Sequence, residues 1–596
     1  MLFLPTLAYV AATVCAHYRG DDPPTGDEPM YLLAAESLVD DFDSDLKNNL
    51  QKLGSQAVRN YESLRVVRPH GWFSVHSLGL PALISLPWAL CGALGARLAI
   101  ALCCGLTAPL LYQVISAIWP DRPGALLIAL ALALGMPMAH AASQIYPDLP
   151  AGILLLFLVG KALTAKTEAA TIGWRDLPAS AALAFLPWLH IKYAAPALMV
   201  FGWQALAGGW KRSSLNAVAL GASLALLGWY NWYAFGKPSG PYEGSTALVA
   251  GLNGFIVFMG LHFDQAQGMF LQQPLWLLGL VGLAPMWRSS RRTCVCWLLL
   301  YLASIVPNAL HPNWYGGGSF IGRFGATAVL LWSVPLAHAA RSLVEIDRRA
   351  PAVLAFLSLA LQLALAGNWL TAGQGLLNQD RSVALWRPCV WAYHGFYPYA
   401  LRDYLPYWQP STDFWRYSAN LSAAVAAGGL LAGGLFLPLR PKPALRCLLW
   451  PALGAVLFTA AMPVEQAAAV CRGDHLFRFP GLTGHTVGTW QVAEEGAHAA
   501  GPLALAHGFY PRPGNYRILV DYQAHGATEP VGQVLFHNGK NLAALSALSG
   551  EGGPRRKVSL LHVPRADAGQ PSFIMVWYTG HGTLSVARLA VECCGR

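Results

Sequence analysis

Two adjacent carboxylates, Asp27 and Glu28, stand where a hydrophobic N-terminal segment gives way to a polar loop. The loop reads PTGDEPMYLLAAESLVDDFDSD over residues 24–45, shortly after MLFLPTLAYVAATVCAH. A third acid, Asp148 in SQIYPDLPAG, precedes a later apolar run in the same way. A carboxylate so placed can take a proton from a hydroxyl group that attacks another molecule.

Helix capping is the alternative interpretation of these acids. Asp27 with Pro29 in the next turn is good chemistry for a helix start, and Asp148 precedes Pro150 similarly. Each acid alone fits either interpretation. The topology below brings the two segments to the same membrane face at the same depth. We therefore expect a shared site in which Asp27, Glu28 and Asp148 are the candidate catalytic residues.

Basic residues are expected on the same face. Arg68 in RVVRPHGWF, Lys192 in LHIKYA and Arg323 in SFIGRF lie near predicted membrane boundaries. Arginine offers a planar fork and lysine a point charge for phosphate oxygens. These three residues are the candidates for a donor phosphate. The alternative for each is snorkelling or a structural pair with an acid.

Aromatic and histidine side chains complete the expected site. Tyr146, Trp72 and Trp314 offer stacking faces for a sugar or a prenyl chain, and His311 is expected beside them. No HExxH motif, P-loop or dinucleotide-binding glycine turn is present, so no metal ligands are predicted.

The composition indicates a membrane protein that crosses the bilayer many times. The chain has 596 residues, of which 55% are hydrophobic and 12% charged, about half the charged fraction of soluble domains. The formal net charge is +10, and the basic residues lie in short loops between apolar runs of about 20 residues. Loops rich in Lys and Arg mark the cytoplasmic side of a membrane protein. This placement argues against nucleic acid as a partner. The N-terminal run lacks an early basic segment and a cleavage site, so it is expected to be a retained helix.

Thirteen spans are predicted, with the N-terminus inside and the C-terminus outside. If the apolar segment 77–94 spanned the membrane, the basic loop after Asp148 would lie outside, although Lys and Arg are enriched in cytoplasmic loops. We therefore expect this segment to lie on the outer surface within an external loop, 18–95. The spans are 2–17, 97–118, 123–142, 148–164, 178–191, 193–209, 214–234, 270–286, 293–309, 324–343, 351–369, 419–437 and 446–464.

A second domain is predicted at 470–596, after a transmembrane domain at 1–469. Segments such as YRILVDYQ, RKVSLLHV and SFIMVWYT alternate in hydrophobicity between turns, which is typical of an extracytoplasmic β-sandwich. Cys471 opens this domain and Cys593 with Cys594 closes it, so a disulfide between its ends is a further expectation.

The ordered segments GDEPMYLLAAESL, RPHGWFSVHSLGLP, QIYPDLPAG and HPNWYGGGSFIGRF resemble the GT-C superfamily of polyprenyl-phosphate-sugar glycosyltransferases. The resemblance covers residues 1–345 and is greatest to the protein mannosyltransferase and lipid A aminoarabinose transferase branch. It implies that Asp27 is the catalytic base, that Asp148 is a second acid, and that Arg68 and Arg323 bind the donor phosphate.

The same resemblance implies that transfer needs no metal, because no WWD-type motif of diphosphate-donor members is present; a structural divalent cation stays open. Met30 stands where many relatives have histidine, so that histidine is not chemically essential. The C-terminal sandwich resembles the jelly-roll carbohydrate-binding modules of arabinofuranosyltransferases, which favours a pentose over mannose or aminoarabinose.

These features together predict an inverting glycosyltransferase in the bacterial inner membrane, with its active site and C-terminal domain facing the periplasm. Its partners would be a polyprenyl-phosphate-sugar donor, a glycan, lipid or protein acceptor, and membrane lipid. Two alternatives stay open: a transporter or flippase for lipid-linked sugars, and a glycan-binding protein anchored by its helices.

Overall fold

The structure is a computed structural model of the full chain. It describes residues 1–19, 24–55, 61–165, 173–241 except Arg175, 252–263, and 268–372 except 312–315, 317, 318 and 321. In the C-terminal part it describes 491–593, with gaps at 498–499, 510–513, 527–529, 538–541, 551 and 564–571.

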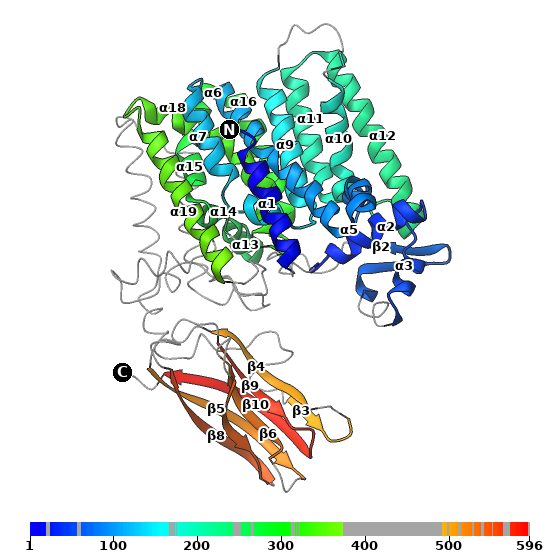
Figure 1. The fold of residues 1–596 in the computed structure, drawn as a ribbon, viewed down its shortest axis with the longest axis vertical. Helices are drawn as coiled ribbons and strands as arrows, with labels where there is room; N and C mark the ends of the chain where they lie inside the picture. The colour runs from blue at the N-terminus through cyan, green and yellow to red at the C-terminus, as the bar shows by residue number, and fades with distance from the viewer. Residues whose placement is uncertain are drawn as a thin grey trace. The chain divides into compact units, whose positions relative to one another are not determined.

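The chain divides into two compact units, a helical one and a β-sheet one (Figure 1). All the described helices belong to the first unit and strands β3 to β10 to the second. The predicted boundary at residue 470 lies outside the described residues.

The helical unit contains a long series of apolar helices and one small β-hairpin. Its N-terminal half comprises α1 (Leu4–Arg19), α2 (Glu28–Asp40), α3 (Lys47–Lys52), η1 (Glu62–Leu64), β1 (Arg65–Arg68), β2 (Gly71–Ser74), α5 (Gly79–Gly105), α6 (Thr107–Ile118), α7 (Arg122–Ala133), α8 (Met138–Ala141), α9 (Asp148–Leu163) and α10 (Leu177–Leu189). Its later elements are η2 (Ile191–Tyr193), α11 (Ala194–Ala207), α12 (Trp210–Phe235), α13 (Leu252–Phe263), α14 (Met269–Gln272), η3 (Pro274–Leu277), α15 (Leu278–Ser289), α16 (Arg291–Ala309), α17 (Arg323–Val329), η4 (Leu330–Trp332), α18 (Ser333–Val344) and α19 (Ala350–Ala372).

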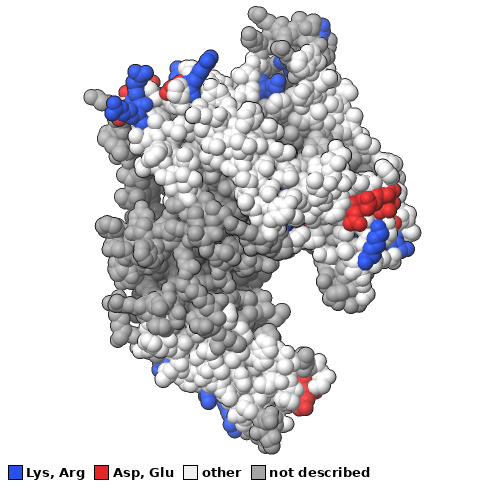
Figure 2. Space-filling view, viewed as in Figure 1, with Lys and Arg blue, Asp and Glu red and all other residues white. Residues whose placement is uncertain are grey.

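This helical unit has the character of a membrane-embedded domain. Among the described residues, three segments are long and apolar enough to cross a bilayer: Gly79–Ile118, Arg291–Ala309 and Arg323–Val344. Figure 2 shows charged side chains gathered toward the ends of this unit, with an almost uncharged surface between them.

The predicted spans up to 351–369 each overlap observed helices. The spans 419–437 and 446–464 lie outside the described residues, so the count of thirteen stays a prediction. Helix α13 was not predicted, because 252–263 is shorter than a membrane crossing.

The segment predicted to lie on the outer surface, 77–94, forms the first part of α5. The helix breaks at Cys91 and Gly92, whose backbone angles are not helical. Gly92 has φ +58°, a conformation that glycine adopts without a Cβ clash. The chain therefore changes direction close to the predicted end of the surface segment, ahead of the span at 97–118.

Glycine allows the closest helix contacts in this unit. At Gly282 of α15 an added Cβ would lie 1.7 Å from the carbonyl oxygen of Pro335 in α18. Small residues at helix crossings permit such close backbone approach in membrane proteins, where burial from water does not drive association. The α15–α18 packing thus depends on the absence of a side chain at this position.

The second unit consists of two four-stranded antiparallel sheets. The strands are β3 (Gln491–Glu494), β4 (Gly501–Phe509), β5 (Gly514–His525), β6 (Gly532–His537), β7 (Leu542–Leu548), β8 (Gly552–Val563), β9 (Ser572–Tyr578) and β10 (Thr583–Cys593). Their order is β3-β10-β5-β8 in one sheet and β4-β9-β6-β7 in the other. This is the strand order of a jelly roll, in which two Greek keys form a pair of sheets.

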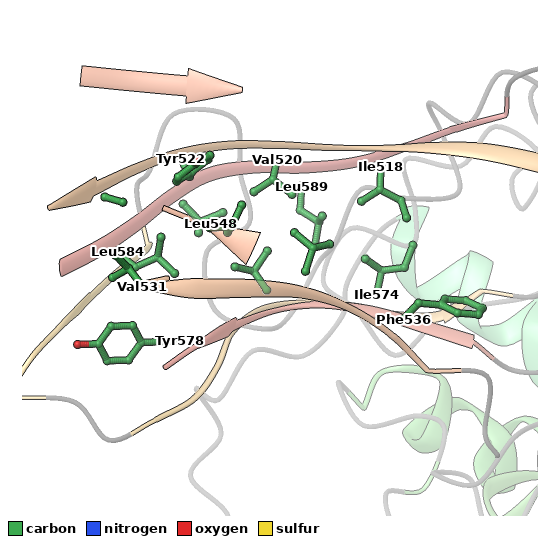
Figure 3. Packing of buried hydrophobic residues seen from close by; sticks show 14 of the residues in the cluster. Ile518, Val520, Tyr522, Val531, Phe536, Leu548, Ile574, Tyr578, Leu584 and Leu589 are labelled. Atoms are coloured by element: carbon green, nitrogen blue, oxygen red, sulfur yellow. The ribbon is translucent and has the colours of Figure 1, made fainter. Parts of the chain in front are cut away.

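One apolar core joins the two sheets. Alternate residues of β5, namely Tyr516, Ile518, Val520 and Tyr522, face inward and are buried. They meet side chains of the opposite sheet such as Ile574, as Figure 3 shows. The period-two pattern in the sequence arises from this one-sided burial. The predicted disulfide from Cys471 to Cys593 or Cys594 stays a prediction, because Cys471 lies outside the described residues.

We expect Gly282→Ala to destabilise the helical unit, because the added methyl group forces α15 away from α18. Overpacking of this kind typically costs about 1–3 kcal/mol. The thermal unfolding midpoint of the purified protein in detergent measures the effect. Gly221→Ala in α12 is the matched control, since no atom lies within 4 Å of its added Cβ. An equal midpoint for the two variants would contradict the role of this contact.

Candidate functional site

Neither of the two predicted acid sites uses its side chain to cap a helix. Asp27 is the N-cap residue of α2, but its carboxylate makes no capping hydrogen bond. Asp148 is the first residue of α9, and Pro147 occupies the N-cap position before it. The carboxylates instead face other parts of the chain, so the structure decides against the capping alternative.

Asp148 is fully buried and is surrounded by donors. Its Oδ1 accepts hydrogen bonds from Lys192 Nζ at 2.7 Å and from the Tyr193 hydroxyl at 2.6 Å. Its Oδ2 accepts from Arg323 Nε at 2.8 Å, and its backbone oxygen accepts from the Thr327 hydroxyl at 2.7 Å. This set of contacts fixes the carboxylate and joins α9, η2 and α17.

Arg323 connects the two acid sites. Its Nη1 donates to Asp27 Oδ2 at 3.0 Å and lies 3.4 Å from the carbonyl oxygen of Gly316, while Nε holds Asp148. The guanidinium stacks on Tyr146, with Cζ 4.1 Å from the ring centroid. One arginine therefore brings together residues that lie more than a hundred positions apart in the sequence.

Local backbone features place Arg323 at this point. Gly322 has φ +78°, and a Cβ there would lie 2.3 Å from Gln272 Nε2, so glycine is required on both counts. Gly152 of α9 lies opposite Thr327 of α17, where an added Cβ would be 3.0 Å from the Thr327 Cα. The two helices can thus approach closely enough for a direct Asp148–Arg323 pair.

We call Asp27, Asp148, Lys192 and Arg323 the ion-pair cluster. It contains two acids and two bases, and the side chain of Asp148 is 0% exposed, that of Arg323 9% and that of Asp27 26%. Burial lowers the pKa of Lys192, and the Asp148 carboxylate opposes that shift. Buried charges are tolerated only when they are paired in this way. Asp27 is the member that is most open to a ligand.

Glu28 takes a different position from its neighbour Asp27. It is fully buried, and its carboxylate accepts hydrogen bonds from the backbone N–H groups of Thr25 at 2.8 Å and Ile145 at 2.7 Å. Arg97 lies 3.8 Å away. Burial is the main cause that raises the pKa of Glu28 to about 7, and the backbone donors oppose it. These are the contacts of a residue that positions the Asp27 loop; its catalytic role stays a prediction.

Two of the predicted substrate-binding residues lie beside the ion-pair cluster. Tyr146 covers Arg323, and its hydroxyl donates to the Thr25 carbonyl oxygen at 2.8 Å. The ring of His311 packs edge-on against Phe324, with 5.6 Å between ring centroids. Burial lowers the pKa of His311, and the nearby charges of Lys192 and Arg323 act in the same direction.

Arg68 and Trp72 lie elsewhere, on the β1–β2 hairpin. The Arg68 guanidinium sits against Gly236, the residue that ends α12, where a Cβ would be 1.7 Å from Nη2. Trp72 packs under Arg65, with the guanidinium carbon 4.4 Å from the ring centroid. Among the described residues, no contact joins either side chain to the ion-pair cluster. Trp314 lies outside the described residues.

Several residues of the site were not selected from the sequence. Tyr193 holds Asp148, and Asn308 accepts from Lys192 Nζ at 3.1 Å while donating to the Phe324 carbonyl oxygen at 2.8 Å. Asn308 could have been found as a polar residue near the end of an apolar span, since such residues are commonly functional. His76 is another residue of the site that was not selected from the sequence, and its Nε2 lies 3.7 Å from Asp27 Oδ1.

Within the described part of the chain, no group of three or more histidine, cysteine, aspartate or glutamate side chains is arranged to hold a metal ion. The acids of the site are instead matched by arginine and lysine. The arrangement can bind an anion next to a partly exposed carboxylate.

No family model matches the chain, and no curated protein sequence matches it significantly. Two similar solved structures are ArnT from Cupriavidus metallidurans in the apo state, at TM-score 0.40, and the same protein bound to undecaprenyl phosphate, at TM-score 0.38. In each case 14% of aligned residues are identical, and the alignment covers 78% of either chain.

We expect Asp148→Asn to destabilise the helical unit strongly, because it leaves the buried charges of Lys192 and Arg323 without their shared acid. Breaking a buried pair in this way typically costs about 3–5 kcal/mol. Thermal unfolding in detergent measures the loss. Arg212→Met is the control, since it removes the more exposed Arg212–Asp176 pair and should cost about 1 kcal/mol or less. Equal losses in the two variants would contradict the structural importance of Asp148.

We expect the protein to lose stability as the pH rises from about 5 to about 7. The pKa of Glu28 is raised in the folded state, so the folded protein holds a proton that the unfolded chain has already released. The free energy of unfolding must then fall across this window. Unfolding midpoints measured at successive pH values should show this slope in the wild type and a smaller one in Glu28→Gln. An identical slope in both proteins would contradict the assignment to Glu28.

Proposed function

We propose that the chain is an integral membrane glycosyltransferase of the GT-C type, which moves one sugar from a polyprenyl-phosphate donor to an acceptor outside the cytoplasm. The observation that carries the proposal is the pairing of Asp27 with Arg323. It combines a partly exposed carboxylate that can accept a proton with a buried cation that can hold a phosphate.

The chemistry is a single displacement at the anomeric carbon of the donor sugar. Asp27 takes the proton of the acceptor hydroxyl while the acceptor oxygen forms a bond to this carbon. The bond between the carbon and the phosphate oxygen breaks, and its electron pair remains on the polyprenyl phosphate. One displacement inverts the anomeric configuration, and neither a metal nor another cofactor is required.

Arg323 and Lys192 are placed to stabilise the charge that grows on the leaving phosphate. Among the described residues, the hydrogen bonds of Arg323 use Nε and Nη1, so Nη2 can reach a ligand oxygen. A phosphate that also competes for Nη1 would release Asp27 Oδ2. The carboxylate would then be a stronger base, because a neighbouring cation favours its charged form. Donor binding would in this way prepare the base.

Arg68 remains a proposed ligand of the donor, although its place on the hairpin sets it beside the end of α12. Tyr146 and His311 border the ion-pair cluster and are the proposed contacts of the sugar. Glu28 keeps Asp27 in place through the loop that both share.

An apolar groove supports a lipid-linked donor. It lies between α6, α9 and α10, has a volume of about 630 Å³, and is lined by residues such as Leu110, Phe157 and Phe185. Ile153 is the first residue of α9 that lines the groove, and it lies about 7–8 Å along the helix from Asp148. An isoprenoid chain is an occupant with matching apolar chemistry, and its phosphate could reach the ion-pair cluster.

The orientation and the substrates complete the proposal. The active site and the jelly-roll unit face the periplasm, because a lipid-linked sugar is needed where nucleotide sugars are absent. The jelly-roll unit binds the acceptor, which is a glycan, a lipid or a protein. A pentose such as arabinofuranose is the proposed sugar.

We expect Asp27→Asn to abolish sugar transfer while the protein still folds and still binds its donor. Loss of a general base lowers the rate by about 10²–10⁴-fold. The protein should still fold, because Arg323 keeps its ion pair with Asp148 and Asp27 caps no helix. Native mass spectrometry of Asp27→Asn, purified gently with its lipids, should show a bound polyprenyl monophosphate that carries one sugar.

Asp40→Asn is the matched control, since Asp40 is an exposed acid at the end of the same α2 helix. It should transfer sugar at the wild-type rate. An active Asp27→Asn enzyme would remove the base assignment. A diphosphate-linked species in the spectrum would indicate oligosaccharide transfer or flipping, and ordinary phospholipid alone would indicate a glycan-binding protein.

A further inference from the structure

His76 is buried next to Asp27, and its ring nitrogen Nε2 lies opposite the Asp27 carboxylate. It follows the β1–β2 hairpin and precedes α5, and its backbone N–H donates to Ser74 Oγ at 3.1 Å. Its ring lies against Tyr31 of α2, with 4.8 Å between centroids. The backbone and the ring are therefore each held by one contact, and only 9% of the residue is exposed.

The two oxygens of Asp27 face different partners. Oδ2 accepts from Arg323 Nη1 at 3.0 Å, and Oδ1 lies 3.7 Å from His76 Nε2. The carboxylate does not bond to the first turn of α2. Among the described residues, His76 and Arg323 are thus the side chains that orient Asp27.

His76 faces Asp27 as a neutral donor. Burial lowers the pKa of His76, so its ring is uncharged at neutral pH. A carboxylate oxygen opposite Nε2 favours the tautomer that carries the proton on that nitrogen. Within the described residues, Nε2 is buried and makes no hydrogen bond, since 3.7 Å is longer than the usual 2.9–3.0 Å. A shift of about 0.7 Å would close this bond, and catalytic bonds are commonly long before substrate binds.

A neutral donor has an effect on Asp27 that Arg323 cannot provide. The Arg323 cation holds the carboxylate but makes it a weaker base. Arg323 is also the residue to which a donor phosphate would bind. A neutral N–H orients the carboxylate at a smaller cost in basicity. Once the bond to Nε2 has closed, this N–H also holds Oδ1 after Oδ2 has been released.

We propose that His76 is a positioning residue, which holds Asp27 through Oδ1 while Arg323 turns to the donor phosphate. This inference rests on the proposed function, because it concerns the orientation of the proposed base. Asp27 still receives the proton of the acceptor hydroxyl. His76 contacts neither the sugar nor the phosphate and keeps its own proton throughout.

Two substitutions separate positioning from packing. His76→Phe keeps a ring against Tyr31 and removes the N–H, whereas His76→Gln keeps a side-chain N–H at a similar reach. We expect His76→Phe to lower kcat about 10- to 100-fold with KM for the donor within about twofold, since small displacements of a reacting group have effects of this size. His76→Gln should recover most of the loss. A kcat for His76→Phe within about twofold of wild type would overturn the proposal.

His70→Phe is the control for histidine replacement in the same hairpin. Its ring nitrogen Nε2 lies 3.0 Å from the Tyr233 carbonyl oxygen, on the side of α12. It should leave kcat unchanged. A loss in His70→Phe equal to that in His76→Phe would show that the hairpin fold is being measured, and would also overturn the proposal.

A second readout does not depend on sugar transfer. A water-soluble carbodiimide with an amine labels carboxyl groups, and peptide mass spectrometry measures the extent of labelling on Asp27 at one fixed pH. The N–H opposite Oδ1 favours the charged carboxylate, so Asp27 should be labelled more extensively in His76→Phe than in the wild type, and His76→Gln should restore the wild-type extent. An unchanged extent of labelling in His76→Phe would overturn the proposal.

Among the described residues, the other titratable groups that face His76 are Arg323, Tyr31 and His190, and they are the same in every variant. The change in labelling therefore isolates the ring N–H. If the wild-type protein transfers no sugar from polyprenyl monophosphate donors, the proposed function fails. The extent of Asp27 labelling then still decides whether His76 positions Asp27.

Discussion

The contact on which the rest of the site depends is the bridge that Arg323 makes between Asp27 and Asp148. A buried guanidinium is tolerated only when carboxylates face it. Asp148 is in turn shared with Lys192 and Tyr193, so α9, α17, η2 and the start of α2 must come together for any of these charges to be buried. The need to pair every buried charge therefore favours one arrangement of these four segments.

Close helix packing makes that arrangement sterically possible. Glycine stands where helices approach most closely, at Gly152 opposite α17 and at Gly282 opposite α18, and Gly322 turns the chain directly before Arg323. These positions contribute no chemistry of their own. They allow the backbones to approach until short polar contacts form, and in a membrane such contacts have no water to replace them.

The three acids of the site differ in role because they differ in surroundings. Glu28 is buried among backbone N–H groups and joins the first loop to Ile145. Asp148 is saturated by three side-chain donors, and Asp27 alone combines partial exposure with a cation beside it. The proposed transfer needs these different roles, because only a carboxylate that can reach solvent can exchange a proton with an incoming hydroxyl.

The sequence by itself determined the elements and the chemistry available to them. Apolar runs predicted the helices, alternation predicted strands such as β5, and polar residues at the ends of apolar runs singled out Asp27, Asp148, Lys192 and Arg323. Only the tertiary structure decided that Glu28 turns inward while Asp27 faces the site, that Arg68 lies by α12, and that His76 meets Asp27. Neighbouring residues of a helix point about 100° apart, and contacts across helices depend on crossings that local sequence does not encode.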